Sequence, residues 1–321
     1  MAKKAYRVRN WREYNEALVN RGNIFFWFSE DVVARWHEND SHHKRGRPRK
    51  YSEMAIECGL TLKAVYKLTF RMTEGYIKSL IKILNIDVEI PDYSLLCKRQ
   101  KTLKVFLSKS KVKPEEAIHI LVDTTGLKVF GEGEWKTRQH GYTKRRQWRK
   151  LHLAINAKTQ EIEAHELTEL GVQDGDGLSL LMSAMDKAID KITGDGAYDQ
   201  YKNYQLAEDK EFQLITPPRK DAKLTKECTG HSSQQKQTPQ MRVALKTRDS
   251  YIERIRQIDR PEWKIEIGYH RRSLAETAMF RLKTILGNRL STRKFENQKV
   301  EAAIWCNVIN RMTQLGMPIS S

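Results

Sequence analysis

Three acidic residues stand where carboxylates can do chemistry. Asp123 ends the apolar run 118–123, Asp195 ends the shorter run 192–195, and Glu276 lies in a segment with helical periodicity. Side chains at strand ends in α/β folds open onto crevices where ligands bind. Three converging carboxylates would offer oxygen ligands to Mg²⁺, and two such ions can stabilise the attacking and leaving oxygens of a phosphoryl displacement. The acids therefore predict a metal-dependent site that acts on phosphodiesters.

Two alternatives to this interpretation stay open at the level of the sequence. An acid at the end of a strand often caps the following turn or helix, and for Asp123 or Asp195 taken alone that is the commoner role. Asp199, four residues after Asp195, is a rival for the second acid.

Four polar residues form a stripe around the third acid. Tyr269, Arg272, Glu276 and Lys283 are separated by 3, 4 and 7 residues. At about 100° per residue they fall within a sector of roughly 60° on a helix, away from the apolar residues of the same segment. The stripe is either a solvated face with an Arg272–Glu276 pair or the edge of an active site, because both predict polar residues opposite the core.

Two basic segments are candidates for contact with DNA. The first spans residues 144–150 and contains five cations and an indole: Lys144, Arg145, Arg146, Trp148, Arg149 and Lys150. The cations can neutralise phosphates and Trp148 can stack on an unpaired base, although a lone Trp is more often a core anchor. The second segment, with Arg47 and Arg49 around a proline, can enter a minor groove as extended chain or serve as a solvated linker.

The composition limits the class of protein. Lys and Arg number 58 against 40 Asp and Glu, which leaves a formal charge of +18 and favours a polyanionic partner. There is no apolar window long enough to span a membrane, and no export signal. The four cysteines match no zinc or disulfide spacing. We therefore expect a cytoplasmic protein that does not bind membranes.

Hydrophobic periodicity predicts the elements that must position these residues. Residues 52–85 favour two helices joined near residues 73–75, which is typical of a helix-turn-helix but also of ordinary helical packing. Strands followed by alternating helices indicate a mixed α/β architecture. The predicted strands are residues 118–123, 127–130, 151–156, 161–168, 192–195, 212–216 and 264–268. The predicted helices are residues 177–190, one between residues 195 and 212, 273–286 and 296–312.

At this point the sequence resembles the bacterial insertion-sequence transposases with a DDE catalytic core. The match is to the branch whose third acid lies in a Tyr-x2-Arg-x3-Glu-x6-Lys signature, which residues 269–283 fit at every defined position. Asp123 in Asp-Thr-Thr-Gly looks like the first catalytic acid, and Asp195 in Gly-Asp-Gly-Ala-Tyr-Asp looks like the second. The resemblance covers roughly residues 115–310.

The resemblance implies a fold and a domain organisation. The fold would be a ribonuclease-H-like mixed sheet flanked by helices, preceded by a helical N-terminal DNA-binding region. The boundaries would be residues 1–112 for that region and 113–321 for the catalytic core, with a polar insertion at about residues 217–262.

It also implies a reaction. Such an enzyme binds terminal inverted repeats in double-stranded DNA, cuts there and joins the 3′-hydroxyl ends to target DNA, as a homodimer or larger synaptic complex in the nucleoid. Asp123, Asp195 and Glu276 would hold two Mg²⁺ ions, with Mn²⁺ as a substitute. Lys283 and Arg272 would contact phosphate near the scissile bond, and Tyr269 would help position the strand or the helix itself.

Two other functions are compatible with the composition. A non-catalytic DNA-binding protein, such as a repressor or a domesticated relative, would keep the basic surface without the reaction. A structure-selective nuclease on the same fold would share the metal site but would cut without joining. The acid triad and the polar stripe favour the transposase over the DNA-binding protein.

Overall fold

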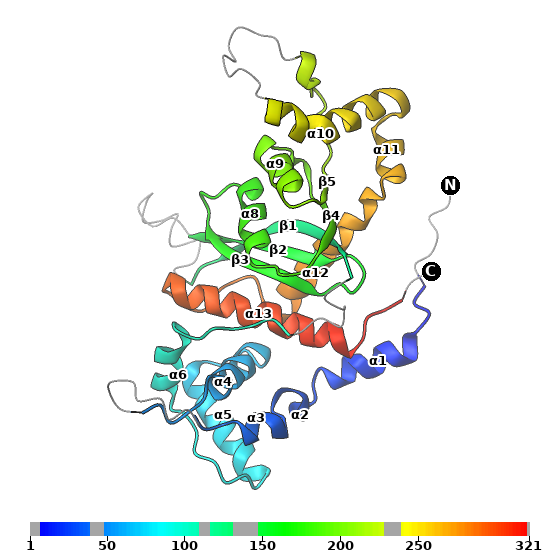
Figure 1. Ribbon diagram of the computed structural model, residues 1–321. Helices are drawn as coiled ribbons and strands as arrows, with labels where there is room; N and C mark the ends of the chain where they lie inside the picture. The colour runs from blue at the N-terminus through cyan, green and yellow to red at the C-terminus, as the bar shows by residue number, and fades with distance from the viewer. Residues whose placement is uncertain (1–6, 39–47, 109–115, 131–146, 228–238, 320–321) are drawn as a thin grey trace, which may run out of the picture. The chain divides into compact units, whose positions relative to one another are not determined.

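The computed structural model describes residues 7–38, 48–108, 116–130, 147–227 and 239–319 (Figure 1). Within residues 239–319, the side chains of residues 239–242 are not described. These residues belong to two compact units. One unit comprises Met1–Ser108 together with Leu282–Ser321, and the other comprises Lys109–Arg281.

The second unit is built on a five-stranded mixed sheet with the order β3-β2-β1-β4-β5. The antiparallel strands β1, β2 and β3 follow one another in the chain, whereas β4 and β5 add in parallel on the other side of β1. The strands are β1 (Ile118–Lys128), β2 (Trp148–Asn156), β3 (Ile162–Glu169), β4 (Ile189–Thr193) and β5 (Gln213–Ile215). A mixed sheet flanked by helices confirms the predicted fold class.

One face of this sheet carries the core of the unit. Ile118, Ile120 and Val122 alternate along β1 and pack in one cluster with residues of α8 (Asp174–Ser183) and α9 (Tyr201–Asp209). Figure 1 shows both helices on the same side of the sheet. Because side chains alternate along a strand, Asp123 points to the opposite face. Burial of the apolar face thus fixes the direction in which the acid projects.

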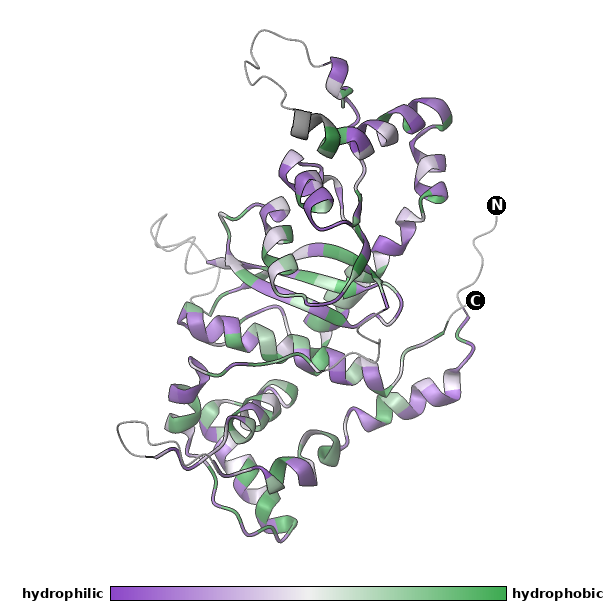
Figure 2. Ribbon diagram, viewed as in Figure 1, coloured by the Kyte–Doolittle hydropathy of each residue, from purple (hydrophilic) through white to green (hydrophobic). Residues whose placement is uncertain are grey.

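A helical segment completes the second unit. It contains the short turns η3 (Thr225–Glu227) and η4 (Tyr269–Arg272), the helices α10 (Pro239–Ile258) and α11 (Arg260–Glu266), and α12 (Ser273–Leu286) as far as Arg281. A further short turn, η2 (Gly196–Tyr198), lies between β4 and α9. Figure 2 shows hydrophilic residues along most of α10 and α11. Trp263 of α11 is buried, with only 2% of it exposed. Its ring centroid lies 5.3 Å from that of Tyr251 in α10 and 6.4 Å from that of Tyr269 in η4. Trp263 therefore anchors η4, which leads into α12.

The first unit is helical. Its elements are α1 (Trp11–Asn20), α2 (Ile24–Trp27), α3 (Glu30–Ala34), α4 (Glu53–Val65), α5 (Phe70–Ile83), α6 (Tyr93–Gln100), the last turn of α12, and α13 (Phe295–Leu315). The Ser52 and Thr69 hydroxyls accept hydrogen bonds from the backbone amides of Ala55 and Met72, so each caps the start of a helix. In this unit α13 packs against α4.

The structure corrects several predicted elements. A single strand, β1, covers residues 118–128 in place of the two predicted strands, because Gly126 continues the pairing with β2. The joint between the first two predicted helices lies at residues 66–69, and residues 73–75 are inside α5. The predicted strand 264–268 is wrong, because residues 260–266 form α11. The helix predicted for residues 177–190 ends at Ser183, and β4 begins at Ile189.

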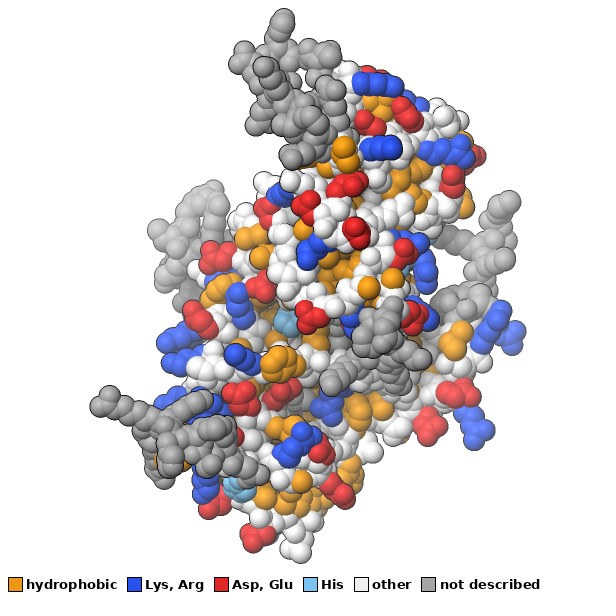
Figure 3. All heavy atoms as spheres, viewed as in Figure 1, with side chains coloured by type: hydrophobic (Ala, Val, Ile, Leu, Met, Phe, Trp, Pro, Cys, Tyr) orange, Lys and Arg blue, Asp and Glu red, His pale blue; other side chains and the backbone are white. Residues whose placement is uncertain are grey.

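The described surface has two general features. On the face drawn in Figure 3, Lys and Arg side chains are interspersed with Asp and Glu, so the described part of the positive surplus does not gather into a single patch there. Among the described residues, no helix has both the length and the apolar composition that crossing a membrane requires.

Candidate active site

Asp195 follows the end of β4, as expected, whereas Asp123 lies inside β1 and not at the end of a strand; both acids lie just beyond the parallel pairing of β1 with β4. Leu121 of β1 lies opposite Thr193 of β4, and each acid follows two residues later. A two-residue step keeps a side chain on the same face of a sheet, so Asp123 and Asp195 project to the same side. Asp195 also caps η2, because its Oδ1 accepts a hydrogen bond from the Ala197 amide at 2.9 Å. The capping role and the place in the acidic cluster are therefore compatible.

The third acid is connected to the first by an arginine. Arg272, at the end of η4, donates from Nη1 to Asp123 Oδ2 at 3.1 Å and from Nη2 to Glu276 Oε1. The exposed fractions of the side chains are 21% for Arg272, 17% for Asp123 and 57% for Glu276. A solvated surface pair accounts for only half of this arrangement, because Arg272 also reaches a half-buried acid 149 residues earlier.

The pKa of Asp123 reflects the charges of the other two acids. Burial raises the pKa of Asp123, whereas the Thr124 amide and the Arg272 guanidinium lower it. The negative charges of Asp195 and Glu276 raise this pKa further. Like charges have this effect only when they are near, so Asp195 and Glu276 each lie within electrostatic reach of Asp123.

The donor set has the chemistry that a hard divalent cation requires, because all three side chains end in carboxylate oxygens. The ligand geometry is not assembled in advance. Among the described residues, no three Asp, Glu, His or Cys side chains converge closely enough to hold a metal ion as they stand. The guanidinium of Arg272 instead provides a positive charge to two of the acids.

Two further members of the stripe lie along the same segment. Tyr269 is 9% exposed, and its ring centroid lies 6.0 Å from Arg272 Cζ. Burial raises the pKa of Tyr269, and the charges of Asp195 and Asp123 act on it in the same direction. Lys283 is on α12 seven residues after Glu276 and hence on the same helical face. Burial lowers the pKa of Lys283.

A buried hydrogen-bond network, which sequence analysis did not predict, adjoins Asp123 through its neighbour Thr124. His152 is fully buried, with Nδ1 at 2.9 Å from Thr124 Oγ1 and Nε2 at 2.9 Å from Thr168 Oγ1. The Tyr198 hydroxyl lies 3.3 Å from the same Thr124 oxygen. Burial lowers the pKa of His152, which favours the neutral ring. The network ties β1, β2, β3 and η2 together next to the acids.

Asp199 has a different environment from Asp195. Its carboxylate accepts hydrogen bonds from Arg248 Nε at 2.9 Å, from Arg248 Nη2 at 3.3 Å and from the Tyr204 hydroxyl at 3.1 Å. The side chain is only 2% exposed. Both of its oxygens are engaged in holding α9 and α10 together, which favours Asp195 as the second acid.

The predicted DNA-contacting residues are only partly covered by the structure. Arg47, Lys144, Arg145 and Arg146 lie outside the described residues. Arg49 is exposed and lies 3.5 Å from the Glu53 carboxylate. The contacts of these residues with DNA stay predictions.

The end of the basic segment is described, and its side chains contact the protein itself. Lys150 Nζ donates to Asp174 Oδ1 at 2.9 Å, and Arg149 lies 3.8 Å from Glu169. Trp148 is half-buried on β2, with Lys128 Nζ 5.5 Å from its ring centroid. Lys150 and Arg149 therefore already have acidic partners, and the half-buried Trp148 leaves both of its predicted roles open.

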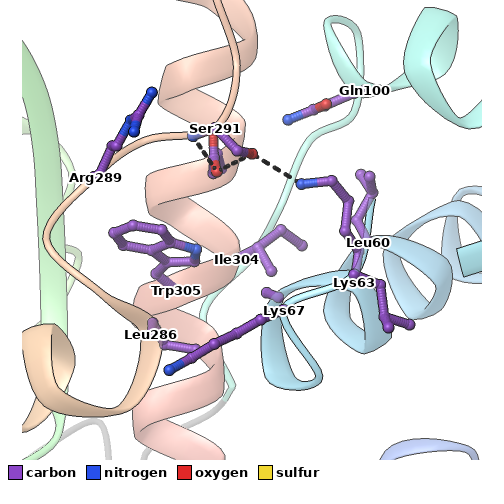
Figure 4. A pocket seen from close by; sticks show the side chains of 12 residues that line it. Leu60, Lys63, Lys67, Gln100, Leu286, Arg289, Ser291, Ile304 and Trp305 are labelled. Atoms are coloured by element: carbon purple, nitrogen blue, oxygen red, sulfur yellow. Dashed lines mark hydrogen bonds between the residues drawn. The ribbon is translucent and has the colours of Figure 1, made fainter. Parts of the chain in front are cut away.

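A separate hollow of about 240 Å³ lies within the first unit (Figure 4). Lys63 donates to Ser291 Oγ at 2.9 Å, and Ser291 in turn donates to Glu301. Glu301 Oε1 accepts hydrogen bonds from Ser291, and Glu301 Oε2 accepts hydrogen bonds from Thr292. Among the described residues that line this hollow, Glu301 is the only one with a carboxylate, and its hydrogen bonds hold the loop at residues 291–292. The hollow therefore lacks the paired acids of the candidate site.

Comparison with known families agrees with this geometry. A family model described as "Transposase DDE domain" matches residues 114–311, a range that contains all three acids and the whole stripe. A second model with the same description matches residues 19–132.

Proposed function

Because the chain belongs to the transposase DDE domain family, whose members cleave DNA and transfer strands, we propose that it binds transposon ends, cuts there and joins the 3′-hydroxyl ends to target DNA. The observation that carries the proposal is the acidic cluster. Asp123, Asp195 and Glu276 come from three separate parts of the chain, and the charges of Asp195 and Glu276 both act on Asp123.

Each residue of the site has a proposed role. Asp123, Asp195 and Glu276 would hold two divalent ions, Mg²⁺ or in its place Mn²⁺. When bound, the ions activate water or a 3′-hydroxyl and stabilise the leaving oxygen. The Thr124 and Ala197 amides hold the two aspartates in place through 2.8 Å and 2.9 Å hydrogen bonds.

The remaining members of the stripe would act on the DNA. Arg272 and Lys283 would neutralise phosphate charge near the scissile bond, where a positioned cation stabilises the charge that develops in the transition state. Tyr269, whose ring contacts Arg272, would help position the DNA strand or the helix itself. Neither role requires a covalent bond between enzyme and DNA.

The proposed partners are terminal inverted repeats and target DNA in the nucleoid. Residues 52–85 would read the end sequence, while basic residues contact the backbone, because phosphate contacts position a protein and base contacts specify the sequence. Cutting two ends together implies a homodimer or larger synaptic complex.

The test is the variant Asp195→Asn, which removes a charged ligand and almost no volume. We expect strand cleavage to be lost in a purified assay with Mg²⁺ or Mn²⁺, while affinity for end DNA is kept. Ca²⁺ should support binding but not cleavage. The control Asp209→Asn makes the same change at an exposed position at the end of α9 and should cleave like the wild type. Undiminished cleavage by Asp195→Asn would refute the assignment.

A further inference from the structure

The guanidinium of Arg272 lies where a divalent cation would compete with it. Its two terminal nitrogens donate to two different acids, Nη1 to Asp123 and Nη2 to Glu276. An arginine binds carboxylates through this fork of parallel donors, and it uses the same lone pairs that a metal ion uses. An ion that takes as ligands the lone pairs that Arg272 uses must therefore displace at least one of the two hydrogen bonds.

Charge adds to this competition. Arg272 and Asp123 are 21% and 17% exposed, so their interaction is screened less than that of an exposed pair. A guanidinium and a divalent ion at the same two carboxylates also repel one another. The metal-free arrangement is thus stabilised by the arginine, and the affinity for the metal is lowered to the same extent.

A DNA phosphate can remove the arginine from the acids. Phosphate oxygens match the planar donor fork as carboxylates do. Arg272 keeps 21% of its side chain exposed, so an anion can approach it. The ring of Tyr269, with its centroid 6.0 Å from Cζ, offers the guanidinium a further favourable contact that does not depend on the acids.

We propose that Arg272 is an exchangeable counter-ion, which holds the charge of Asp123 and Glu276 in the DNA-free protein and moves to a DNA phosphate when the substrate binds. DNA binding and metal binding are then coupled, because each favours the state in which Arg272 has left the acids. The inference rests on the proposed function, in which these acids are the metal ligands. It adds that the DNA-free enzyme binds its metal weakly.

The experiment measures Mn²⁺ binding to the DNA-free full-length protein by electron paramagnetic resonance. Arg272→Gln should bind Mn²⁺ about tenfold more tightly than the wild type, a typical size for a coupling between two sites. The matched control is Arg271→Gln, which removes the same charge from the adjacent residue. Arg271 donates to the carbonyl oxygen of Ala157 and not to the acids, so its variant should stay within about twofold of the wild type.

A second variant keeps the charge. Arg272→Lys retains one positive group but cannot present the fork to two acids, so its affinity for Mn²⁺ should lie between those of the wild type and Arg272→Gln. This variant decides the matter if the glutamine variant does not fold, as judged by circular dichroism. Equal affinities in the wild type and the Arg272 variants, or equal gains in the Arg271 and Arg272 variants, would overturn the inference.

Adding Asp195→Asn to each protein separates this inference from the proposed function. Loss of Mn²⁺ binding on that change, without any gain from the Arg272 variants, would leave the metal site standing and reject the counter-ion. Mn²⁺ binding that is indifferent to Asp195→Asn would reject the proposed metal site itself, and the counter-ion with it.

Discussion

Asp195 and Asp199 show how surroundings give the same side chain two different roles. Asp195 lies in the acidic cluster and accepts a hydrogen bond from the backbone amide of Ala197. Asp199 is buried and bonded to Arg248 and Tyr204. Removing one partner of a buried ion pair leaves the other charge uncompensated, and that is strongly destabilising.

For Asp199→Ala we therefore expect a loss of stability without a loss of chemistry. The free energy of unfolding should fall by about 3 kcal/mol, as expected when one member of a buried pair is removed. Urea denaturation measures this quantity. Single-turnover cleavage at low temperature, corrected for the folded fraction, should stay within a few-fold of the wild type. Loss of cleavage at unchanged stability would instead make Asp199 the second acid.

His119 predicts how stability changes with pH. Its Nε2 lies 2.9 Å from Thr193 Oγ1. Burial lowers the pKa of His119 from 6.5 to about 4, helped by the charges of Lys191 and Arg271 and opposed by that of Asp190. Between these values the unfolded chain binds the proton and the folded protein does not. The contribution of His119 to stability is therefore complete above about pH 6.5 and is lost as the pH falls toward 4.

Urea denaturation between pH 4.5 and 7.5 measures this effect. His119→Gln keeps a polar group that can bond Thr193 but removes the titration. Its free energy of unfolding should fall less steeply than that of the wild type as the pH decreases. Identical slopes in the two proteins would show that His119 does not contribute to the acid sensitivity.

At the scale of elements, two glycines in helices make opposite predictions. A Cβ on Gly177 of α8 would lie 2.2 Å from His152 Nδ1, and that ring is held at both nitrogens. A Cβ on the exposed Gly75 of α5 would meet nothing within 4 Å. Gly177→Ala should destabilise the protein by about 2 kcal/mol or more, as overpacking does. Gly75→Ala should stabilise it by about 0.5–1 kcal/mol.

Thermal unfolding of both variants and the wild type tests this pair. Because the chemical change is the same, the difference isolates the contact between α8 and the His152 ring. A stabilising Gly177→Ala would mean that α8 can move away from β2 at little cost.

The same elements show what the sequence could and could not predict. Helix α12 was predicted with its observed bounds, because its apolar and polar stripes repeat over four turns. Residues 264–268 alternate over only five positions, which fits a strand or a helix turn equally. The overlooked signal was Pro261, which lies in the first turn of α11. Similarly, the cap at Thr69 marked the true start of α5.

The candidate site, too, could be predicted from the sequence only in part. Asp195 could be found from the end of a strand and Glu276 from the stripe, whereas Asp123 was found from the end of an apolar run although its strand continues to Lys128. The bond from Arg272 to Asp123 could not, because it joins residues 149 apart and depends on how η4 packs against β1. The hydrogen bonds of the His152 ring could not be predicted either, because the sequence of an alternating strand does not indicate which residues face a histidine in it.

At the scale of the molecule, the first unit is assembled from both ends of the chain. Gln100 donates to the carbonyl oxygen of Asn297, and Asn307 donates to Glu57. Arg311 donates to the carbonyl oxygen of Phe26. The helices before residue 108 thus share buried contacts with α13, although the sequence placed α13 in the catalytic core.

We expect residues 1–108 alone to lack cooperative unfolding, because the apolar side of α4 that packs on α13 would face water. Adding residues 282–321 through a flexible linker should restore a sharp thermal transition. Circular dichroism melting and binding of a hydrophobic dye compare the two proteins. A cooperative transition in residues 1–108 by themselves would support the boundary predicted at residue 112.

The strand order of the sheet also sets a sequence of events in folding. Strands β1, β2 and β3 are consecutive and can pair early, whereas β4 must close a longer stretch of chain before it lies beside β1. Asp123 and Asp195 meet only at that later stage, and Glu276 follows from 81 residues further on. A chain that is still emerging from the ribosome therefore presents its basic N-terminal residues before the acidic cluster has formed.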